Sequence, residues 1–302
     1  MSLIVILGPT AVGKTQLAVQ LSDKLDGEII SADSRQVYRD MDLGTGKDLK
    51  DYIVDGKQVP FHLIDIKQAG DAYNVFDFQQ DFYIAYEAII RKGKTAILCG
   101  GTGLYLEAAL AKEKMLEVPE NTSLREELTV LSQKELINRL TSLIKNVHNN
   151  TDLIDRERTI RAIEIELFKS QHVELQLSPV KKFKIIGLRM ERENLRKRIS
   201  ERLEVRLQEG MMEEAERLLN QGVSHEQLDY YGLEYRFLSA YMQGKVSYDE
   251  MFEGLVQAIR RFAKKQMTWY RRMEKKGQII YWIDAEESMD IKVQQALKLL
   301  NK

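Results

Sequence analysis

The stretch "GPTAVGKT" at residues 8–15 has the glycine, lysine and threonine spacing of a phosphate-binding loop. In such a loop the backbone N–H groups and the positive end of the following helix bind a di- or triphosphate. Lys14 would neutralise phosphate oxygens, and the Thr15 hydroxyl would bind Mg²⁺. The candidate residues for binding a diphosphate or a nucleotide are therefore Gly8, Pro9, Thr10, Ala11, Val12, Gly13, Lys14 and Thr15.

A second candidate is Asp33, in the stretch "SADSRQVYRDMDLGTGK" at residues 31–47. It follows a short apolar run, where α/β sheets present catalytic groups. A carboxylate at that position serves as a metal ligand or a general base, although Asp33 and Ser34 are equally suitable helix N-caps. The two stretches leave open ATP-binding and other nucleotide-binding hydrolases, small-molecule kinases, and transferases that consume a diphosphate.

Short apolar runs without polar alternation are the elements that would position these groups. They are "LIVIL", "EIISA", "TAILCGG", "FKIIGL" and "QIIYWI", and helical patterns separate the earlier ones. Strands of this kind are typical of a parallel sheet that helices bury on both faces. The sequence therefore predicts an α/β fold, with a parallel sheet like that of P-loop NTPases.

Residues 119–175 have a purely helical pattern, which predicts an all-helical insertion domain between two parts of a core domain, 1–118 and 176–302. Two capping boxes are expected, Ser123 with Glu126 and Ser132 with Glu135. Leu136, Leu140 and Leu143 follow the second box at a spacing that places them on one helix face.

Composition sets further bounds. The 302 residues have a formal net charge of −1, so binding of an anionic partner depends on local clusters of Lys and Arg. Cys99 is the single cysteine, which excludes an internal disulfide. No targeting leader or membrane-spanning run is evident, and no long heptad seam stands out. We expect a cytoplasmic protein that is monomeric and does not contact a membrane.

The chain resembles the tRNA dimethylallyltransferases, also called tRNA isopentenyltransferases. The resemblance depends on "GPTAVGKT", "EIISADSRQVYRDMDLGTGK", "FHLIDI", "CGGTGLYLEAAL" and "FAKKQMTWYR", which occur in the family's order and cover essentially the whole chain. It implies transfer of a dimethylallyl group from dimethylallyl diphosphate to N6 of the adenine beside the anticodon of tRNA.

The same resemblance assigns roles to individual residues. Asp33 would be the general base that accepts the amine proton, and Thr102 would contact the substrate base. Residues that match the family's tRNA-contact stretch are Asp33, Ser34, Arg35 and Gln36. An exocyclic amine is a poor nucleophile, so removal of its proton as the new bond forms would help the reaction.

Three arginines of the helical region match tRNA-contacting positions of the family: Arg125, Arg158 and Arg161. Each also fits a solvated helix surface. The family's usual His-Pro-Asn-Asp lead-in reads "DLID" at 152–155, which leaves only Asp155 in place.

Arg198 and Arg202 lie four residues apart in a long charged helix, on one face of it. They would either reach the donor diphosphate or form part of an exposed, salt-bridged surface. Further along, Leu233 and Glu234 replace the tyrosine and the basic residue that the family usually has, and an acidic group there would repel an RNA backbone.

The segment 260–276, "RRFAKKQMTWYRRMEKK", contains eight Lys or Arg residues and one Glu. The cations are candidate RNA contacts. Phe262, Met267 and Tyr270 recur at helical spacing, which favours core packing over base stacking.

Two other functions stay open. One is a small-molecule P-loop kinase or a prenyltransferase that acts on a free nucleotide, although neither would need the helical insertion and the basic helices. The other is a catalytically silent RNA-binding relative, which the departures at 152–154 and 233–234 would suit. Intact Lys14, Thr15, Asp33 and Thr102 argue against the silent relative.

Overall fold

The structure is a computed structural model that describes residues 3–143, 153–171 and 177–301. The chain divides into two compact units, here called the core unit (Met1–Ala111 and Pro179–Lys302) and the insertion unit (Lys112–Ser178). The domain boundary expected at residues 175 and 176 and the first residue of the expected departure, Asp152, lie outside the described residues.

The core unit contains a six-stranded sheet in the order β5-β2-β6-β1-β7-β8, with every neighbouring pair parallel. All five predicted runs form strands of this sheet, so the predicted α/β fold is confirmed. A small antiparallel hairpin accompanies it. The strands are β1 (Leu3–Leu7), β2 (Gly27–Ser31), β3 (Ile53–Val54), β4 (Lys57–Gln58), β5 (Phe61–His62), β6 (Thr95–Gly100), β7 (Phe183–Arg189) and β8 (Ile280–Asp284).

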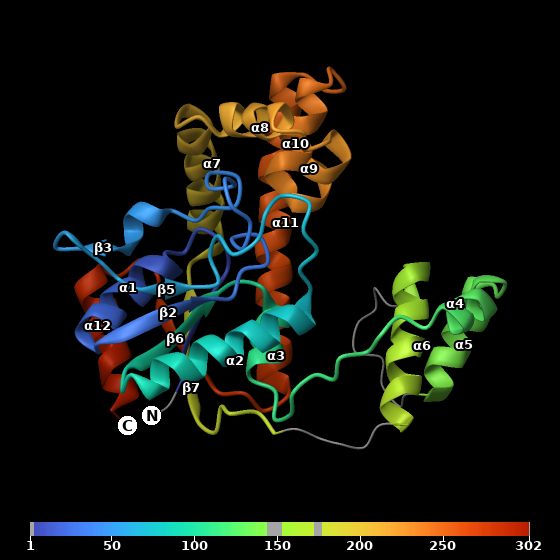
Figure 1. Ribbon diagram of the computed structural model, residues 1–302. Helices are drawn as coiled ribbons and strands as arrows, with labels where there is room; N and C mark the ends of the chain where they lie inside the picture. Colours follow the sequence, from blue (N-terminus) through green and yellow to red (C-terminus); the bar gives the residue numbers. More distant parts are fainter. Residues whose placement is uncertain (1–2, 144–152, 172–176, 302) are drawn as a thin grey trace. The chain divides into compact units, whose positions relative to one another are not determined.

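Helices cover both faces of this sheet (Figure 1). Those of the core unit are α1 (Lys14–Lys24), a 3-10 turn η1 (Leu49–Tyr52), α2 (Val75–Arg91), α3 (Gly103–Ala109), α7 (Arg192–Gln208), α8 (Met211–Asn220), α9 (His225–Tyr231), α10 (Leu233–Met242), α11 (Tyr248–Lys275) and α12 (Met289–Leu300). None of the described helices combines the length and apolar character that a membrane crossing needs.

Strand β1 shows why its sequence lacks polar alternation. Its odd-numbered residues pack in a core cluster with Phe82 of α2 and Tyr105 of α3. Its even-numbered residues pack in a second cluster with Leu17 of α1 and Val293 of α12. Both faces of the strand are therefore buried, as in other parallel sheets.

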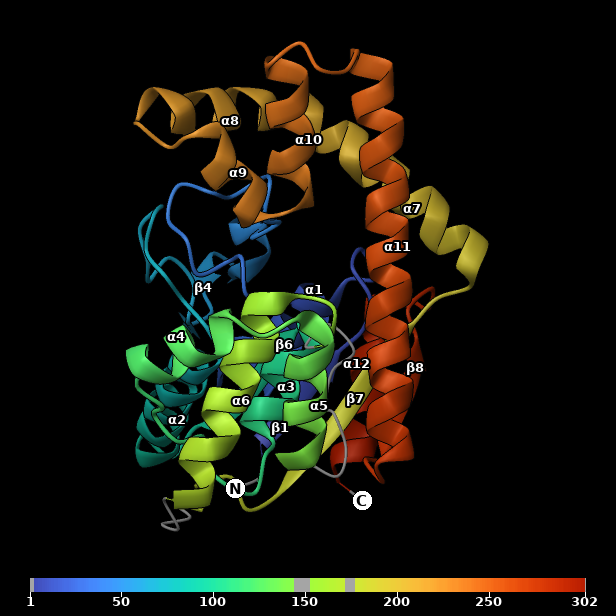
Figure 2. The same cartoon turned by 90° about the vertical axis from the view of Figure 1, so that its right-hand side faces the viewer.

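Helices α7–α11 form a second layer of the core unit. In Figures 1 and 2, α11 runs from the neighbourhood of α10 at one end to the sheet at the other. Its 28 residues begin at a capping box in which Ser247 pairs with Glu250. One helix thus connects the outer helices with the strand ends of the sheet.

The insertion unit is helical, with α4 (Thr122–Thr129), α5 (Gln133–Leu143) and α6 (Arg156–Gln171). Its core includes Leu136 and Leu140, both fully buried, whereas Leu143 is 38% exposed. The Ser132–Glu135 capping box is confirmed, with Ser132 N–H donating to Glu135 Oε2 at 2.8 Å. The Ser123 box is wrong: Asn121 caps α4 instead, because its Oδ1 already accepts the N–H of Leu124.

Candidate active site

The predicted phosphate-binding loop connects β1 to α1. Gly13 caps the helix with φ of 84°, a left-handed conformation that glycine adopts without steric cost. Lys14 is the first residue of the helix, and its Nζ donates to the carbonyl of Pro9 at 2.9 Å. Burial lowers the pKa of Lys14 to about 8. A bound anion would favour the charged form again.

Asp33 and Thr102 follow the carboxyl ends of the neighbouring strands β2 and β6. Thr102 Oγ1 accepts the N–H of Ser34 at 3.2 Å, and Asp33 Oδ1 accepts the N–H of Arg35 at 2.9 Å. The helix N-cap interpretation of Asp33 is wrong, because turns and bends rather than a helix follow it. The two loops therefore hold a carboxylate and a hydroxyl side by side.

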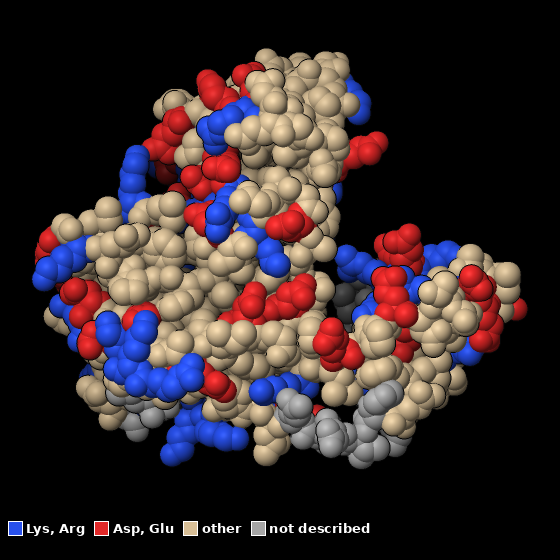
Figure 3. Space-filling view, viewed as in Figure 1, with Lys and Arg blue, Asp and Glu red and all other residues tan. Residues whose placement is uncertain are grey.

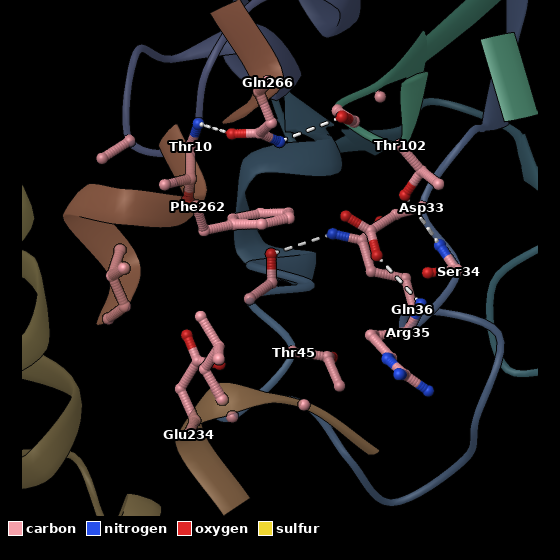
Figure 4. Close-up of a pocket in the computed structure, with 18 of the residues that line it drawn as sticks. Thr10, Asp33, Ser34, Arg35, Gln36, Thr45, Thr102, Glu234, Phe262 and Gln266 are labelled. Carbon is pink, nitrogen blue, oxygen red and sulfur yellow. Dashed lines mark hydrogen bonds between the residues drawn. The ribbon is translucent and has the colours of Figure 1, made fainter. Parts of the chain in front are cut away.

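A cavity of about 760 Å³ collects these groups within the core unit. Its lining includes Lys14, Thr15, Asp33, Thr102, Arg198 and Arg202, which sequence analysis had placed in four separate stretches. Ser34, Arg35 and Gln36 also line it, and Figure 4 shows these side chains next to Asp33. Gly8, Pro9 and Val12 are not among the lining residues, whereas Thr10, Ala11 and Gly13 are.

Helix α11 joins the phosphate-binding loop to the loop after β6, a contact that sequence analysis missed. Gln266 Oε1 accepts the N–H of Thr10 at 2.8 Å, and its Nε2 donates to the Gly101 carbonyl at 3.0 Å (Figure 4). One turn further on, the Tyr270 hydroxyl lies 2.9 Å from the Gly8 carbonyl. The four-residue spacing of Gln266 and Tyr270 was the available signal.

The aromatic residues of α11 have different positions. Tyr270 is fully buried, which confirms the core prediction, and Met267 packs against the same cluster. Phe262 is 42% exposed and its ring projects into the cavity, so the prediction of a core position is wrong there. Helical spacing shows that Phe262 lies on the same face of α11 as the core residues, but at Phe262 this face borders the cavity.

Three arginines of α7 line the cavity at four-residue spacing: Arg198, Arg202 and Arg206. Arg202 and Arg206 both pair with Asp48, the latter at 3.0 Å. The Arg202 side chain is 31% exposed and that of Arg206 10%. This helix face is therefore salt-bridged but lines the cavity, and Arg206 is an addition to the predicted set.

The departures at 233 and 234 also lie at the cavity, because Leu233 and Glu234 line it. Burial raises the pKa of Glu234 above its ordinary value, although Arg206 and Arg202 oppose that shift. Residue 234 thus supplies a carboxyl group to the cavity, where the family pattern given in the sequence analysis has a basic residue.

In the insertion unit, Arg125 and Arg161 both bind Glu164, whose side chain is 2% exposed. Arg161 also donates to the Val118 carbonyl at 2.7 Å. Arg158 is exposed, and its backbone N–H donates to Asp155 at 3.0 Å. Arg125 and Arg161, whose side chains are 34% and 37% exposed, thus pair with a buried carboxylate, and Arg158 lies at the surface.

The cavity contains one predicted metal ligand, the Thr15 hydroxyl. Within 3–143, 153–171 and 177–301, no group of three or more His, Cys, Asp or Glu side chains could hold a metal ion. The Thr15 hydroxyl lines the cavity beside Lys14. That donor fits Mg²⁺ bound mainly through substrate phosphates and water, which is its usual mode.

Charge over the surface is mixed, as the net charge suggested. On the face shown in Figure 3, acidic and basic side chains are interspersed between large uncharged areas. Attraction of an anion to the cavity therefore depends on local groups, chiefly Lys14 and the arginines of α7.

Two family models match the chain. The family described as IPP transferase matches residues 36–273, and the one described as isopentenyl transferase matches residues 1–64. The chain is 54% identical to tRNA dimethylallyltransferase 2 of Phocaeicola vulgatus, over 99% of this chain and 97% of that protein. Its structure is similar to that of the full-length tRNA isopentenylpyrophosphate transferase from Bacillus halodurans, with a TM-score of 0.72, 31% identity and coverage of 99% and 95%. A eukaryotic dimethylallyltransferase acting on tRNA, at 23% identity, shares the fold with a TM-score of 0.80, over 100% of this chain and 79% of that one.

Proposed function

The chain belongs to the IPP transferase family of tRNA dimethylallyltransferases, and we propose how its cavity performs this reaction. The enzyme transfers a dimethylallyl group from dimethylallyl diphosphate to a tRNA adenine, at N6 beside the anticodon, and releases diphosphate. The observation that carries the assignment of the site is that the phosphate-binding loop, Asp33 and Thr102 line one cavity.

Asp33 is the general base in this proposal. It accepts the proton of the adenine amine while the amine nitrogen bonds to the prenyl carbon and the carbon–oxygen bond to diphosphate breaks. Thr102 contacts the base, and the hydrogen bond from Ser34 N–H fixes its hydroxyl beside Asp33. The adenine has to leave its stack to reach these groups.

The leaving diphosphate is bound by Lys14, the backbone N–H groups of the loop at residues 8–15, in which Pro9 has none, and the α7 arginines Arg198 and Arg202. The N–H of Thr10 is already bound to Gln266, so other amides of the loop serve this purpose. Thr15 would hold a Mg²⁺ ion, which when bound would neutralise charge on the diphosphate.

The insertion unit and Arg35 and Gln36 of the cavity are the proposed tRNA contacts, with Arg158 as an exposed cation of α6. We further infer a monomer in the cytoplasm, where tRNA is used. All lining residues of the cavity come from one core unit, so no second chain is needed to complete it.

The test is an assay with unmodified tRNA, dimethylallyl diphosphate and Mg²⁺, followed by mass spectrometry of the digested RNA. We expect prenylated adenosine, and a loss of about 10²- to 10⁴-fold in kcat with Asp33→Asn. Asparagine keeps an oxygen for the Arg35 N–H, so the loop is retained. Asp40→Asn is the control, since Asp40 is exposed in the same segment.

Folded protein that binds tRNA without modifying it would restore the silent RNA-binding interpretation. Prenylation of free adenosine phosphates instead of tRNA would indicate a free-nucleotide enzyme.

A further inference from the structure

Residues 41–48 form a loop whose backbone is held by two buried charged side chains. Glu214, 3% exposed, accepts the N–H groups of Asp42, Leu43 and Gly44, each at 2.9 Å. Lys47, fully buried, donates to the Tyr38 carbonyl at 2.6 Å and to Asp42 at 2.7 Å. These contacts hold the backbone of the loop in place and so fix the position of its last residue.

That last residue, Asp48, lies between two arginines at the cavity wall. Its carboxylate accepts from Arg206 Nη2 at 3.0 and 3.1 Å and also from Arg202 Nη2. Asp48 has φ of 43°, a left-handed conformation that aspartate adopts more readily than most residues and that Asp55 shares. Burial alone would raise the pKa of Asp48, but the two guanidinium groups outweigh burial and lower it, so the carboxylate stays charged.

We propose that Asp48 is a positioning residue for the donor diphosphate: it holds Arg202 at the cavity wall, and Arg206 fixes Asp48 in turn. This inference rests on the proposed function. A guanidinium has five N–H donors, so the contact with Asp48 leaves others for an anion. Fixing a long side chain before binding removes part of the entropy that binding would otherwise cost.

The experiment is a double-mutant cycle with Asp48→Asn, Arg202→Ala and the double variant, with KM and kcat for dimethylallyl diphosphate at saturating tRNA. If Asp48 acts through Arg202, Asp48→Asn raises KM about tenfold with little change in kcat, and changes it less than about twofold when Arg202 is absent. Asp48→Glu should recover most of the lost affinity. Asp55→Asn is the matched control, because Asp55 has the same left-handed backbone on an exposed turn.

Two results would overturn the proposal. Equal effects of Asp48→Asn in the two backgrounds would mean that Asp48 only supports the loop. Tighter binding of the donor by Asp48→Asn would mean that Asp48 only neutralises the charge of Arg202. Arg206→Gln weakens the contact with Asp48 by changing the other partner, and it should raise KM similarly. The proposal can therefore still be tested if the Asp48→Asn protein folds poorly. Calorimetry with inorganic diphosphate repeats the cycle without turnover, which separates failure of this inference from failure of the proposed reaction.

Discussion

Arginines pair with carboxylates in both units of the chain, but the surroundings of the two sets differ. In the core unit, Arg202 and Arg206 bind Asp48, whose side chain is 35% exposed in a cavity wall. In the insertion unit, Arg125 and Arg161 bind Glu164, which is 2% exposed.

The two sets differ in the exposure of the shared carboxylate and not in that of the arginines, since the side chains of Arg125 and Arg161 are 34% and 37% exposed and that of Arg202 is 31%. An anion that enters the cavity can reach the arginines beside Asp48. Glu164 instead completes its hydrogen bonds inside the insertion unit, where it also accepts the N–H of Asn121 at 2.5 Å. Since a buried carboxylate needs such partners, we expect substitutions in the cavity to change catalysis and substitutions at Glu164 to change stability.

Among the substitutions that test this comparison, Lys14→Ala should have the largest effect, on catalysis. Loss of the cation that faces the diphosphate should lower kcat/KM for the donor by about 10²- to 10³-fold, as removal of one stabilising donor typically does. Steady-state kinetics at saturating tRNA measure this. Lys24→Ala is the control, because Lys24 is exposed at the other end of the same helix. A drop of less than tenfold would mean that the loop amides and arginines bind the diphosphate without Lys14.

The pH dependence of kcat/KM for the donor is a second test of the role of Lys14. The pKa of Lys14 is lowered to about 8, so the free enzyme loses the charge as pH rises past that value. The kcat/KM for the donor should therefore fall above about pH 8. Lys14→Arg, which stays protonated, should have lower activity and no such fall. A flat profile in the parent up to pH 9.5 would contradict the assignment.

An intermediate effect is expected from Glu164→Gln, on stability rather than catalysis. Removing the charge leaves Arg161 without this counter-ion and Arg125 with Glu120 alone, and weaker hydrogen bonds to the buried group should cost the insertion unit about 2 kcal/mol of unfolding free energy. Hydrogen exchange of the amides in α4–α6 measures it. Glu166→Gln is the control, since Glu166 pairs with the half-exposed Lys169 and such pairs contribute about 0.2–1 kcal/mol.

Acid should act on the same contact. Burial alone would raise the pKa of Glu164, but Arg125, the Asn121 N–H and Arg161 lower it to about 2. A carboxyl with a lowered pKa contributes stability that is complete above its unfolded pKa and is lost as pH falls through the folded value. The insertion unit should therefore lose stability between about pH 4.5 and 2, and Glu164→Gln should remove that dependence. An unchanged acid transition in the variant would assign it to other groups.

Local patterns predicted much of this molecule. The strands and the phosphate-binding loop were evident because a parallel strand buried on both faces and a glycine-rich turn each leave their mark within a few residues. Asp33 could also be predicted as a candidate site residue, because the carboxyl ends of parallel strands meet at one edge of a sheet.

Contacts between distant segments were not predictable in the same way. Gln266 meets Thr10 across 256 positions, and nothing near either residue indicates the other. Phe262 has the spacing of a core residue but faces the cavity, because a helical period does not reveal what lies opposite. The contacts of Arg125 and Arg161 with the buried Glu164 were likewise not predictable, because Glu164 lies in an ordinary charged helix whose sequence does not mark it as buried. Their contact with tRNA stays a prediction.

The smallest expected effect sharpens the comparison within the insertion unit itself. Arg158 is exposed, so Arg158→Ala should leave stability unchanged, weaken tRNA binding about threefold and lower the salt dependence of binding by about one phosphate contact. Arg161→Ala should do the reverse, with lower stability and an unchanged salt slope once the folded fraction is corrected for. Filter binding of tRNA from 50 to 300 mM salt, with hydrogen exchange beside it, compares the two variants. If Arg161→Ala reduced the slope while the unit stayed stable, the contact with Glu164 would be a resting position from which Arg161 moves to the RNA, and burial of the partner carboxylate would no longer separate structural from binding arginines.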